Sequence, residues 1–150
     1  MPKSTTSLSF PDVNVWLALA LEHHVHRRAA QTWWQSSDQK IAFTRFTQIS
    51  LLRLLTTPAA RDGRPLGMAE AWYVYDRFFD DDRVLLVPEP AETEAGFRAA
   101  TAGPEPAPKV WADAWLLAVA QAAEGTVVTF DRALAARGSH CLLLASGEGI

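Results

Sequence analysis

The feature that most constrains the fold is an alternation of short, almost wholly apolar segments with longer amphipathic ones. An apolar run without polar alternation is typical of a strand buried on both faces of a sheet, because helices cover both sides of it. The pattern therefore predicts a three-layer α/β/α sandwich around a central, mainly parallel sheet. We expect strands over 7–11, 41–44, 83–87, 126–130 and 141–144, and helices over 14–21, 25–36, 48–56, 68–79, 91–100 and 110–123, with a short one from Arg132.

Length and composition favour one globular domain over residues 1–150, with apolar residues at 49% and charged residues at 21%. A single cysteine, Cys141, excludes an intramolecular disulfide and a multi-cysteine zinc site. The net charge of −3 excludes a strongly basic coat for nucleic acid. The apolar stretches at 13–21 and 114–123 are too short to cross a bilayer, which takes about 20 residues. We therefore expect a cytoplasmic protein without a membrane partner.

Three aspartates occupy positions where a parallel sheet gathers its reactive groups, beyond the carboxyl ends of the strands. Asp12 and Asp131 each follow an expected strand, and Asp113 lies in the first turn of an expected helix. Taken singly, each is readily explained as a helix cap or as a first-turn acid. Together they predict like charges meeting at one rim, which repel one another unless a cation is present. Carboxylates without Cys or His suit Mg²⁺, with Mn²⁺ as the alternative.

Four segments around these residues occur in the order found in PIN-domain proteins, and the sequence resembles the VapC toxins of bacterial toxin–antitoxin pairs. The segments are 12–19, 47–56, 113–118 and 129–132. The resemblance implies a magnesium-dependent endoribonuclease whose catalytic acids hold one or two metal ions. Asp12, Asp113 and Asp131 match three of the acidic positions of the family. Gln48 stands where the family usually has a glutamate.

The resemblance implies in-line attack by water on an RNA phosphodiester, leaving a 5′-phosphate and a 3′-hydroxyl. We expect Asp12 and Asp113 to anchor the metal and Asp131 to act as a ligand or as a base that orients the water. Gln48 is carried over as a catalytic-site residue. Its amide oxygen can coordinate a metal but adds no negative charge, so metal affinity should be lower than with four carboxylates and a second metal is less certain.

Candidate substrate-binding residues flank these acids. Arg53 lies on the helix that carries Gln48, and Asn14 and Thr129 are close in sequence to Asp12 and Asp131. We also expect Trp111, just ahead of Asp113, to be a groove residue.

Two further polar clusters are interpreted as structural. The histidines at 23, 24 and 26 suit a solvated turn better than a zinc site, and the acidic run 80–82 suits an exposed turn between a helix and a strand.

The resemblance also implies partners: an RNA substrate of the tRNA or rRNA class, a VapB-like antitoxin and a second copy of the chain in a homodimer. A PIN-like module with weakened catalysis that binds RNA or protein remains an alternative, favoured by Gln48. A phosphoacceptor receiver domain is a weaker one, because that fold expects paired acids near the start and a lysine after a late strand. This chain has Asp12 alone and no lysine after residue 109.

Overall fold

The computed structural model describes residues 7–58 and 63–145, which form the α/β/α sandwich that the sequence predicts. The strands are β1 (Leu8–Pro11), β2 (Lys40–Phe43), β3 (Val84–Leu86), β4 (Thr126–Thr129) and β5 (Cys141–Leu143). The helices are α1 (Val13–Ala20), α2 (Arg27–Ser36), α3 (Arg45–Leu55), α4 (Met68–Phe78), α5 (Thr93–Ala100), α6 (Val110–Ala122) and α7 (Arg132–Arg137).

The sheet has the order β3-β2-β1-β4-β5, and all of its strand pairs are parallel. The chain runs outward from β1 through β2 to β3, and then crosses back to β4 on the other side of β1. The boundary between β1 and β4 is therefore the topological switch point, where ligands of open α/β sheets bind beyond the carboxyl ends of the strands.

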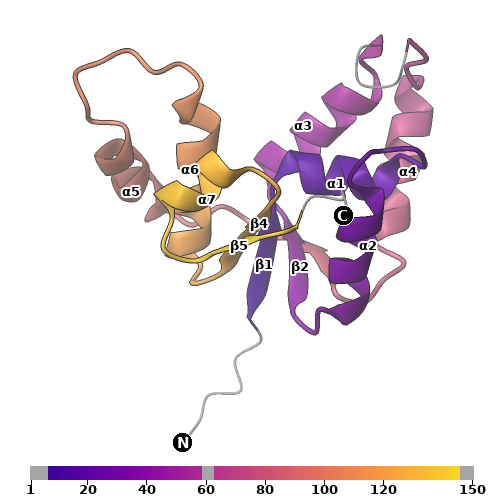
Figure 1. Cartoon of the computed structure of the whole chain (residues 1–150), viewed down its shortest axis with the longest axis horizontal. Coiled ribbons are helices and arrows are strands. Elements are labelled where there is room, and N and C mark those ends of the chain that lie inside the picture. The colour runs from indigo at the N-terminus through magenta and orange to yellow at the C-terminus, as the bar shows by residue number, and fades with distance from the viewer. Residues whose placement is uncertain (1–6, 59–62, 146–150) are drawn as a thin grey trace, which may run out of the picture.

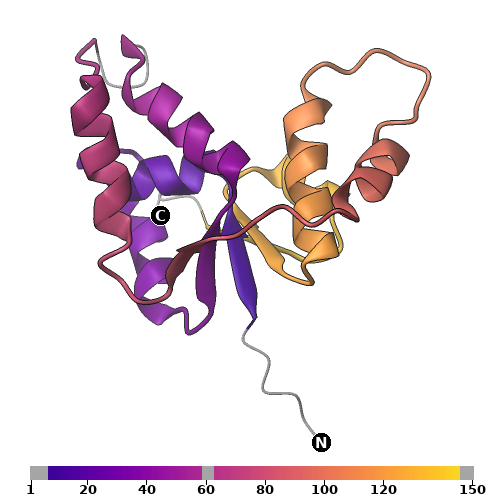
Figure 2. The same cartoon turned by 180° about the vertical axis from the view of Figure 1, so that it is seen from behind.

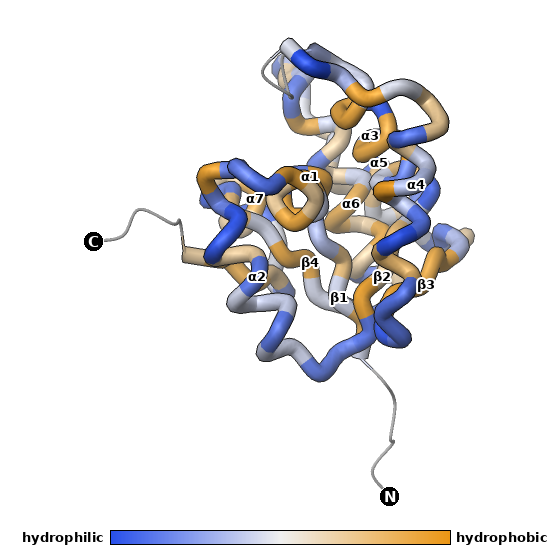
Figure 3. Tube along the Cα trace, turned by 90° about the vertical axis from the view of Figure 1, so that its right-hand side faces the viewer, coloured by the Kyte–Doolittle hydropathy of each residue, from blue (hydrophilic) through white to orange (hydrophobic). Residues whose placement is uncertain are grey.

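Alternating strand residues divide the core between the two faces of the sheet. Ile41 and Phe43 of β2 pack with α1, α2, α3 and α4, whereas Ala42, between them, packs with α6 and α7. Val128 and Val127 of β4 divide in the same way, as the period of two along a strand requires. In Figure 3, α1 is largely hydrophobic, whereas the turn between α2 and β2 is hydrophilic.

The helices form two arms beyond the carboxyl ends of the strands. Figures 1 and 2 show α3 and α4 rising on one side of the sheet and α5 and α6 on the other, with α1 running from the end of β1 on the side of α3 and α4. The segment between α5 and α6, which contains Pro104, Pro106 and Pro108, is a loop. The first residues after β1 and β4 thus lie at the base of two helical walls.

One helix begins earlier than predicted. We expected a helix from Gln48, but α3 begins at Arg45, because Thr44 and Thr47 form a reciprocal capping box. The Thr44 hydroxyl accepts the Thr47 amide at 3.1 Å, and the Thr44 amide donates to the Thr47 hydroxyl at 2.9 Å. Gln48 therefore lies one turn inside α3.

Within the described part of the chain, none of the helices has the length and apolar character needed to span a bilayer.

Candidate active site

Asp12 caps α1 directly at the end of β1. Its Oδ1 accepts hydrogen bonds from the amides of Asn14 and Val15, at 3.0 and 3.1 Å. Its own amide donates to the Val128 carbonyl at 2.9 Å and so extends the pairing of β1 with β4 by one residue. The side chain is only 8% exposed. Position and orientation of this carboxylate are therefore set by backbone on both sides of it.

Thr129, the last residue of β4, joins Asp12 to Asp131. Its hydroxyl donates to Asp12 Oδ2 and accepts the Asp131 amide at 2.9 Å. The residue is fully buried. The parallel register of β1 and β4, in which Pro11 pairs with Val128, brings these residues together although they are far apart in sequence.

Asp131 caps α7 much as Asp12 caps α1. Its Oδ1 accepts the amides of Ala133 and Leu134 at 2.8 and 3.3 Å. The side chain is exposed, and no described group is bonded to its Oδ2. Asp113, in the first turn of α6, is half-buried.

The three carboxylates interact with one another. Burial raises the pKa of Asp12 above its ordinary value, against hydrogen bonds from Thr129, Val15 and Asn14, and the charge of Asp113 adds to the rise. Burial also raises the pKa of Asp113, and the charge of Asp131 raises it further. Asp12 thus meets negative charge from Asp113, and Asp113 meets negative charge from Asp131.

The donor set fits a hard divalent cation, because it consists of carboxylate oxygens and the like charges in it repel. Across 7–58 and 63–145, however, no three His, Cys, Asp or Glu side chains form a ready-made ligand cluster. The described chain therefore presents an acidic rim whose carboxylates would have to draw together around an ion.

Gln48 is 5% exposed and is held by two neighbours. Its Oε1 accepts a hydrogen bond from Arg45 Nη1 at 2.7 Å. It also hydrogen-bonds with the hydroxyl of Tyr75, whose pKa is raised above its ordinary value, chiefly by burial. The amide is thus part of a polar network between α3 and α4.

The comparison with known proteins decides the family. Residues 9–138 match the PIN domain family. The chain is 46% identical over 133 residues to "Ribonuclease VapC41" of Mycobacterium tuberculosis, covering 85% of this chain and 91% of that protein. This chain is a PIN-domain protein of the VapC type.

Solved structures agree with the fold of this PIN domain. VapC20 of Mycobacterium tuberculosis, whose structure is described as that of a "Sarcin-Ricin loop cleaving toxin", superposes with a TM-score of 0.67 at 16% identity, covering 87% of this chain and 95% of that one. VapBC2 of Rickettsia felis, bound to a promoter DNA fragment, gives 0.61 at 13% identity, covering 91% and 96%. At such identities the likeness concerns the fold alone.

The remaining predicted residues of this PIN domain lie at different distances from the acids. Asn14 is exposed in the first turn of α1, where its amide bonds Asp12. Thr129 is fully buried and its hydroxyl is bonded on both sides, so it can position Asp12. Arg53 is exposed in the last turn of α3 and makes no ion pair or side-chain hydrogen bond with the described residues.

Arg137 of α7 also lies at the rim, although no motif in the sequence indicates it. Its Nη1 lies 3.5 Å from Asp113 Oδ2 and partly opposes the rise in the pKa of Asp113. The two side chains come from separate helices, 24 positions apart. No motif in the sequence relates them, although an arginine in the last turn of a short helix that follows a site residue is a weak signal.

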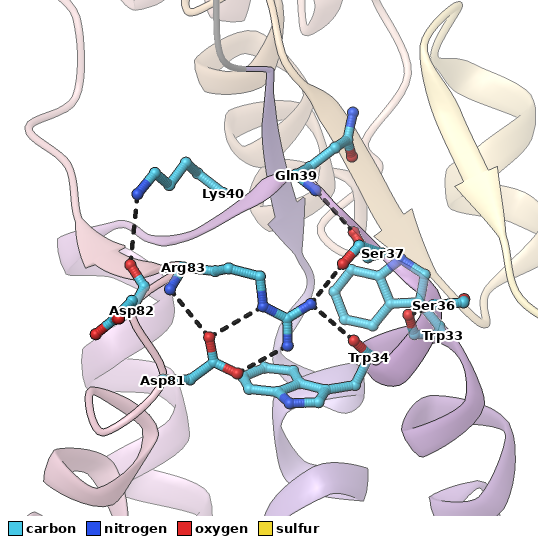
Figure 4. Close-up of polar contacts among 9 residues, drawn as sticks. All are labelled: Trp33, Trp34, Ser36, Ser37, Gln39, Lys40, Asp81, Asp82 and Arg83. Carbon is cyan, nitrogen blue, oxygen red and sulfur yellow. Dashed lines mark hydrogen bonds and ion pairs between the residues drawn. The ribbon is translucent and has the colours of Figure 1, made fainter.

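The acidic run 80–82 is a turn, as predicted, but Asp81 within it is not a solvated charge. Asp81 binds the Arg83 guanidinium through both oxygens, at 3.0 Å to Nε and 2.8 Å to Nη2 (Figure 4). Arg83 Nη1 donates to the carbonyls of Trp34 and Ser37, and the guanidinium lies 5.0 Å over the Trp34 ring. This Asp81–Arg83 clasp ties the start of β3 to the carboxyl end of α2.

The histidine segment is a turn before α2, also as predicted. His26 adds a contact that the sequence did not indicate, because its ring stacks on Phe130, 4.4 Å between centroids. Phe130 lies between Thr129 and Asp131, so the turn supports the chain that carries the rim.

Proposed function

We propose that this PIN domain is a divalent-metal-dependent endoribonuclease, the toxin of a type II toxin–antitoxin pair, with Mg²⁺ as the metal and Mn²⁺ as a substitute. The observation that carries the proposal is the placement of Asp12 and Asp131 directly after the neighbouring strands β1 and β4, joined through Thr129, with Asp113 near enough for its charge to raise the pKa of Asp12. Similarity over most of the chain to a protein named as a ribonuclease supports the same activity.

In this proposal Asp12 and Asp113 are the main ligands of the metal, and Asp131 is a third ligand or orients water. A bound divalent ion supplies charge neutralisation at the phosphate and acidifies a water. Asp12 is held in place by two amides and by Thr129, so it is the fixed ligand toward which the other two carboxylates would move around a cation. The unbonded Oδ2 of Asp131 is the oxygen available for a water.

Cleavage of purified total RNA tests the activity. The wild-type protein should cleave RNA in millimolar Mg²⁺ and lose this activity in EDTA. Asp12→Asn should be inactive, whereas Asp81→Asn, which changes a carboxylate away from the rim, should cleave at the wild-type rate when folded. Cleavage by Asp12→Asn at the wild-type rate would overturn the assignment. Mapping of the cut ends will distinguish tRNA from rRNA as the target class.

A second candidate, a binding module without catalysis, is favoured by one observation: Gln48 replaces a carboxylate and is already bonded to Arg45. This candidate predicts RNA binding without cleavage by the wild-type chain and the appearance of cleavage in Gln48→Glu. Wild-type cleavage in Mg²⁺ excludes it.

For the partners we propose a VapB-like antitoxin and a second copy of the chain. The VapBC2 structure gives a precedent for the pairing. Apolar side chains exposed on α3 and α4 give a surface that suits a partner helix; they include Phe46, Ile49, Met68 and Trp72. Light scattering of the purified chain should give a dimer mass, and co-expression with the antitoxin should suppress RNA cleavage and growth arrest.

A further inference from the structure

A cleft of about 1040 Å³ lies between α5, α6, α7 and the loop that joins α5 to α6. It lies beside the acidic rim, and none of its lining residues belongs to α3 or α4. Its volume is at the upper end of the range for small-molecule pockets, about 300 to 1,000 Å³, so it has room for a group of nucleotide size.

The walls of the cleft suit a flat, partly polar ligand. One wall is the helix surface of Trp111, Ala114 and Ala118, and the facing wall includes Pro106 and Pro108. Trp111 is 55% exposed, and its ring is 5.9 Å from that of Phe97 at its centroid. An exposed indole beside small side chains leaves an aromatic face free for stacking. Prolines restrict the loop, so less conformational entropy is lost when a ligand binds.

The cleft continues into the acidic rim through Arg137. This arginine lines the cleft, and its Nη1 lies 3.5 Å from Asp113 Oδ2. Both side chains remain partly exposed, at 41% and 30%. Arg137 is therefore placed between the acids proposed to cleave RNA and the space beside them, within reach of a phosphate in either.

The ionisable residues of the lining are Arg137 and His140 on one side and Glu105 on the other. Arg137, in the last turn of α7, reaches Asp113, whereas His140 directly precedes β5 at the amino ends of the strands, away from the acids. Trp111 lies in the first turn of α6 together with Asp113, so a polyanionic strand that entered from the rim would meet Trp111 and Arg137 first. An exposed indole and a partly exposed arginine beside the acids favour a nucleotide strand over an apolar peptide as the occupant.

We propose that the cleft binds one or two unpaired nucleotides of the RNA next to the cleaved bond, with a base stacked on Trp111 and the adjoining phosphate held by Arg137. The inference rests on the proposed ribonuclease function, for which it names a site that selects unpaired RNA. Single-stranded segments are the form in which RNA bases are free to stack on protein side chains.

The test is binding of a fluorescently labelled, unstructured ten-nucleotide RNA by the full chain, followed by anisotropy in EDTA so that cleavage plays no part. Trp111→Ala should lower RNA affinity at least about fivefold, the size of a lost base stack. Trp111→Phe should retain most of the affinity, because a phenyl ring also stacks. Tyr73→Ala is the matched control, since Tyr73 is also aromatic, helical and 63% exposed but lies on α4, away from the cleft.

A second variant reports on the phosphate contact without depending on Trp111. Arg137→Gln should reduce the slope of log affinity against log salt by roughly one phosphate contact, about 0.7 for single strands. A purely structural role of Arg137 would leave this slope unchanged. A circular dichroism spectrum like that of the wild type establishes that each variant is folded.

The outcomes separate this inference from the proposed function. Unchanged RNA affinity in Trp111→Ala with intact wild-type cleavage overturns the inference alone, as does the absence of wild-type binding alongside cleavage. Loss of antitoxin affinity in Trp111→Ala without loss of RNA affinity also overturns it, because the cleft would then be a protein-binding site. Weakened RNA binding in Trp111→Ala supports the inference even if the wild-type chain does not cleave.

Discussion

The aspartates of this protein lie in two opposite electrostatic environments, one around Asp81 and one around Asp12 and Asp113. Asp81 is bound through both oxygens by Arg83, and this hydrogen-bonded pair lowers the pKa of Asp81 to about 2. Asp12 and Asp113 have raised pKa values, and Arg137 gives Asp113 only one long contact, at 3.5 Å. The first group joins β3 to α2, and the second lies at the switch point of the sheet.

The difference separates a carboxylate whose charge stabilises the fold from carboxylates whose charge remains available to bind a cation. A carboxylate that holds two elements together is stabilised when an arginine is fixed beside it. A carboxylate that must bind a cation from solution has to remain without such a partner, at a cost in stability. The two groups should therefore respond oppositely to substitution.

Asp113→Asn should have the largest effect on activity. Loss of a main metal ligand is expected to lower RNA cleavage about 10³-fold or more, since the bound ion is worth several kcal/mol in the transition state. The folded pKa of Asp113 lies above its unfolded value, so its ionisation opposes folding at neutral pH, and the variant should unfold at the same or a higher temperature. Cleavage assays and thermal unfolding check both parts, and a cleavage rate within tenfold of wild type would contradict the first.

Arg83→Ala should lower the free energy of unfolding and leave RNA cleavage unchanged. It leaves Asp81 and two carbonyls without their donor, for an expected loss of about 2 kcal/mol in the free energy of unfolding. Arg98→Ala is the control, because its ion pair with Glu94 is exposed and should be worth less than about 0.5 kcal/mol. Urea unfolding measures both. Equal losses in the two variants would show that the Asp81–Arg83 pair stabilises the fold no more than an exposed ion pair does.

Thr129→Val should change the pH dependence of cleavage, because it removes the hydroxyl that bonds Asp12. The hydroxyl of Thr129 lowers the pKa of Asp12, against its burial, so its loss should raise that pKa further. The pH profile of cleavage should then move to higher pH, with activity below neutral pH reduced about tenfold, and Thr129→Ser should restore the profile. A merely structural role would lower activity equally at every pH.

The free energy of unfolding, measured as a function of pH in the acid range, also distinguishes the two groups of aspartates. The folded pKa of Asp81 is about 2 and its ordinary value is 3.8, so its contribution is complete above pH 3.8 and is lost as the pH falls toward 2. Over the same interval the wild type should lose more stability than Asp81→Asn. For Asp12 and Asp113, with raised pKa values, the sign is opposite: protonation relieves repulsion as the pH falls.

Gln48→Glu should have the smallest effect. The new carboxylate would accept from Arg45 as the amide does, so much of its added charge would be compensated. We expect Mg²⁺ affinity to rise by only a few-fold. A rise of a hundredfold or more, measured by calorimetry, would show that the side chain leaves Arg45 to bind the ion.

The sequence was sufficient to predict the parallel sandwich and the positions of Asp12 and Asp131, because both follow from strand runs and the residues that end them. The start of α3 was missed because the capping box uses Thr47 in place of the usual Glu or Gln. The order in which the strands pair, and thus the contact of Thr129 with Asp12, depends on crossovers that local periodicity does not encode.

Contacts between side chains far apart in sequence were the least predictable part. The Asp81–Arg83 pair is local, but its role depends on carbonyls of α2 almost 50 positions away. The contact of Arg137 with Asp113 arises from the packing of α7 beside α6. In both cases the charged residues were visible in the sequence and their partners were not.

The most direct test of the central claim is a Mg²⁺ titration of thermal stability on the wild type and on Asp113→Asn, with Asp81→Asn as control. If repelling carboxylates at the rim bind the ion, Mg²⁺ should raise the unfolding temperature of the wild type and of Asp81→Asn but not of Asp113→Asn. An equal shift in all three proteins, or none in any, would contradict the claim that these aspartates are held for a metal.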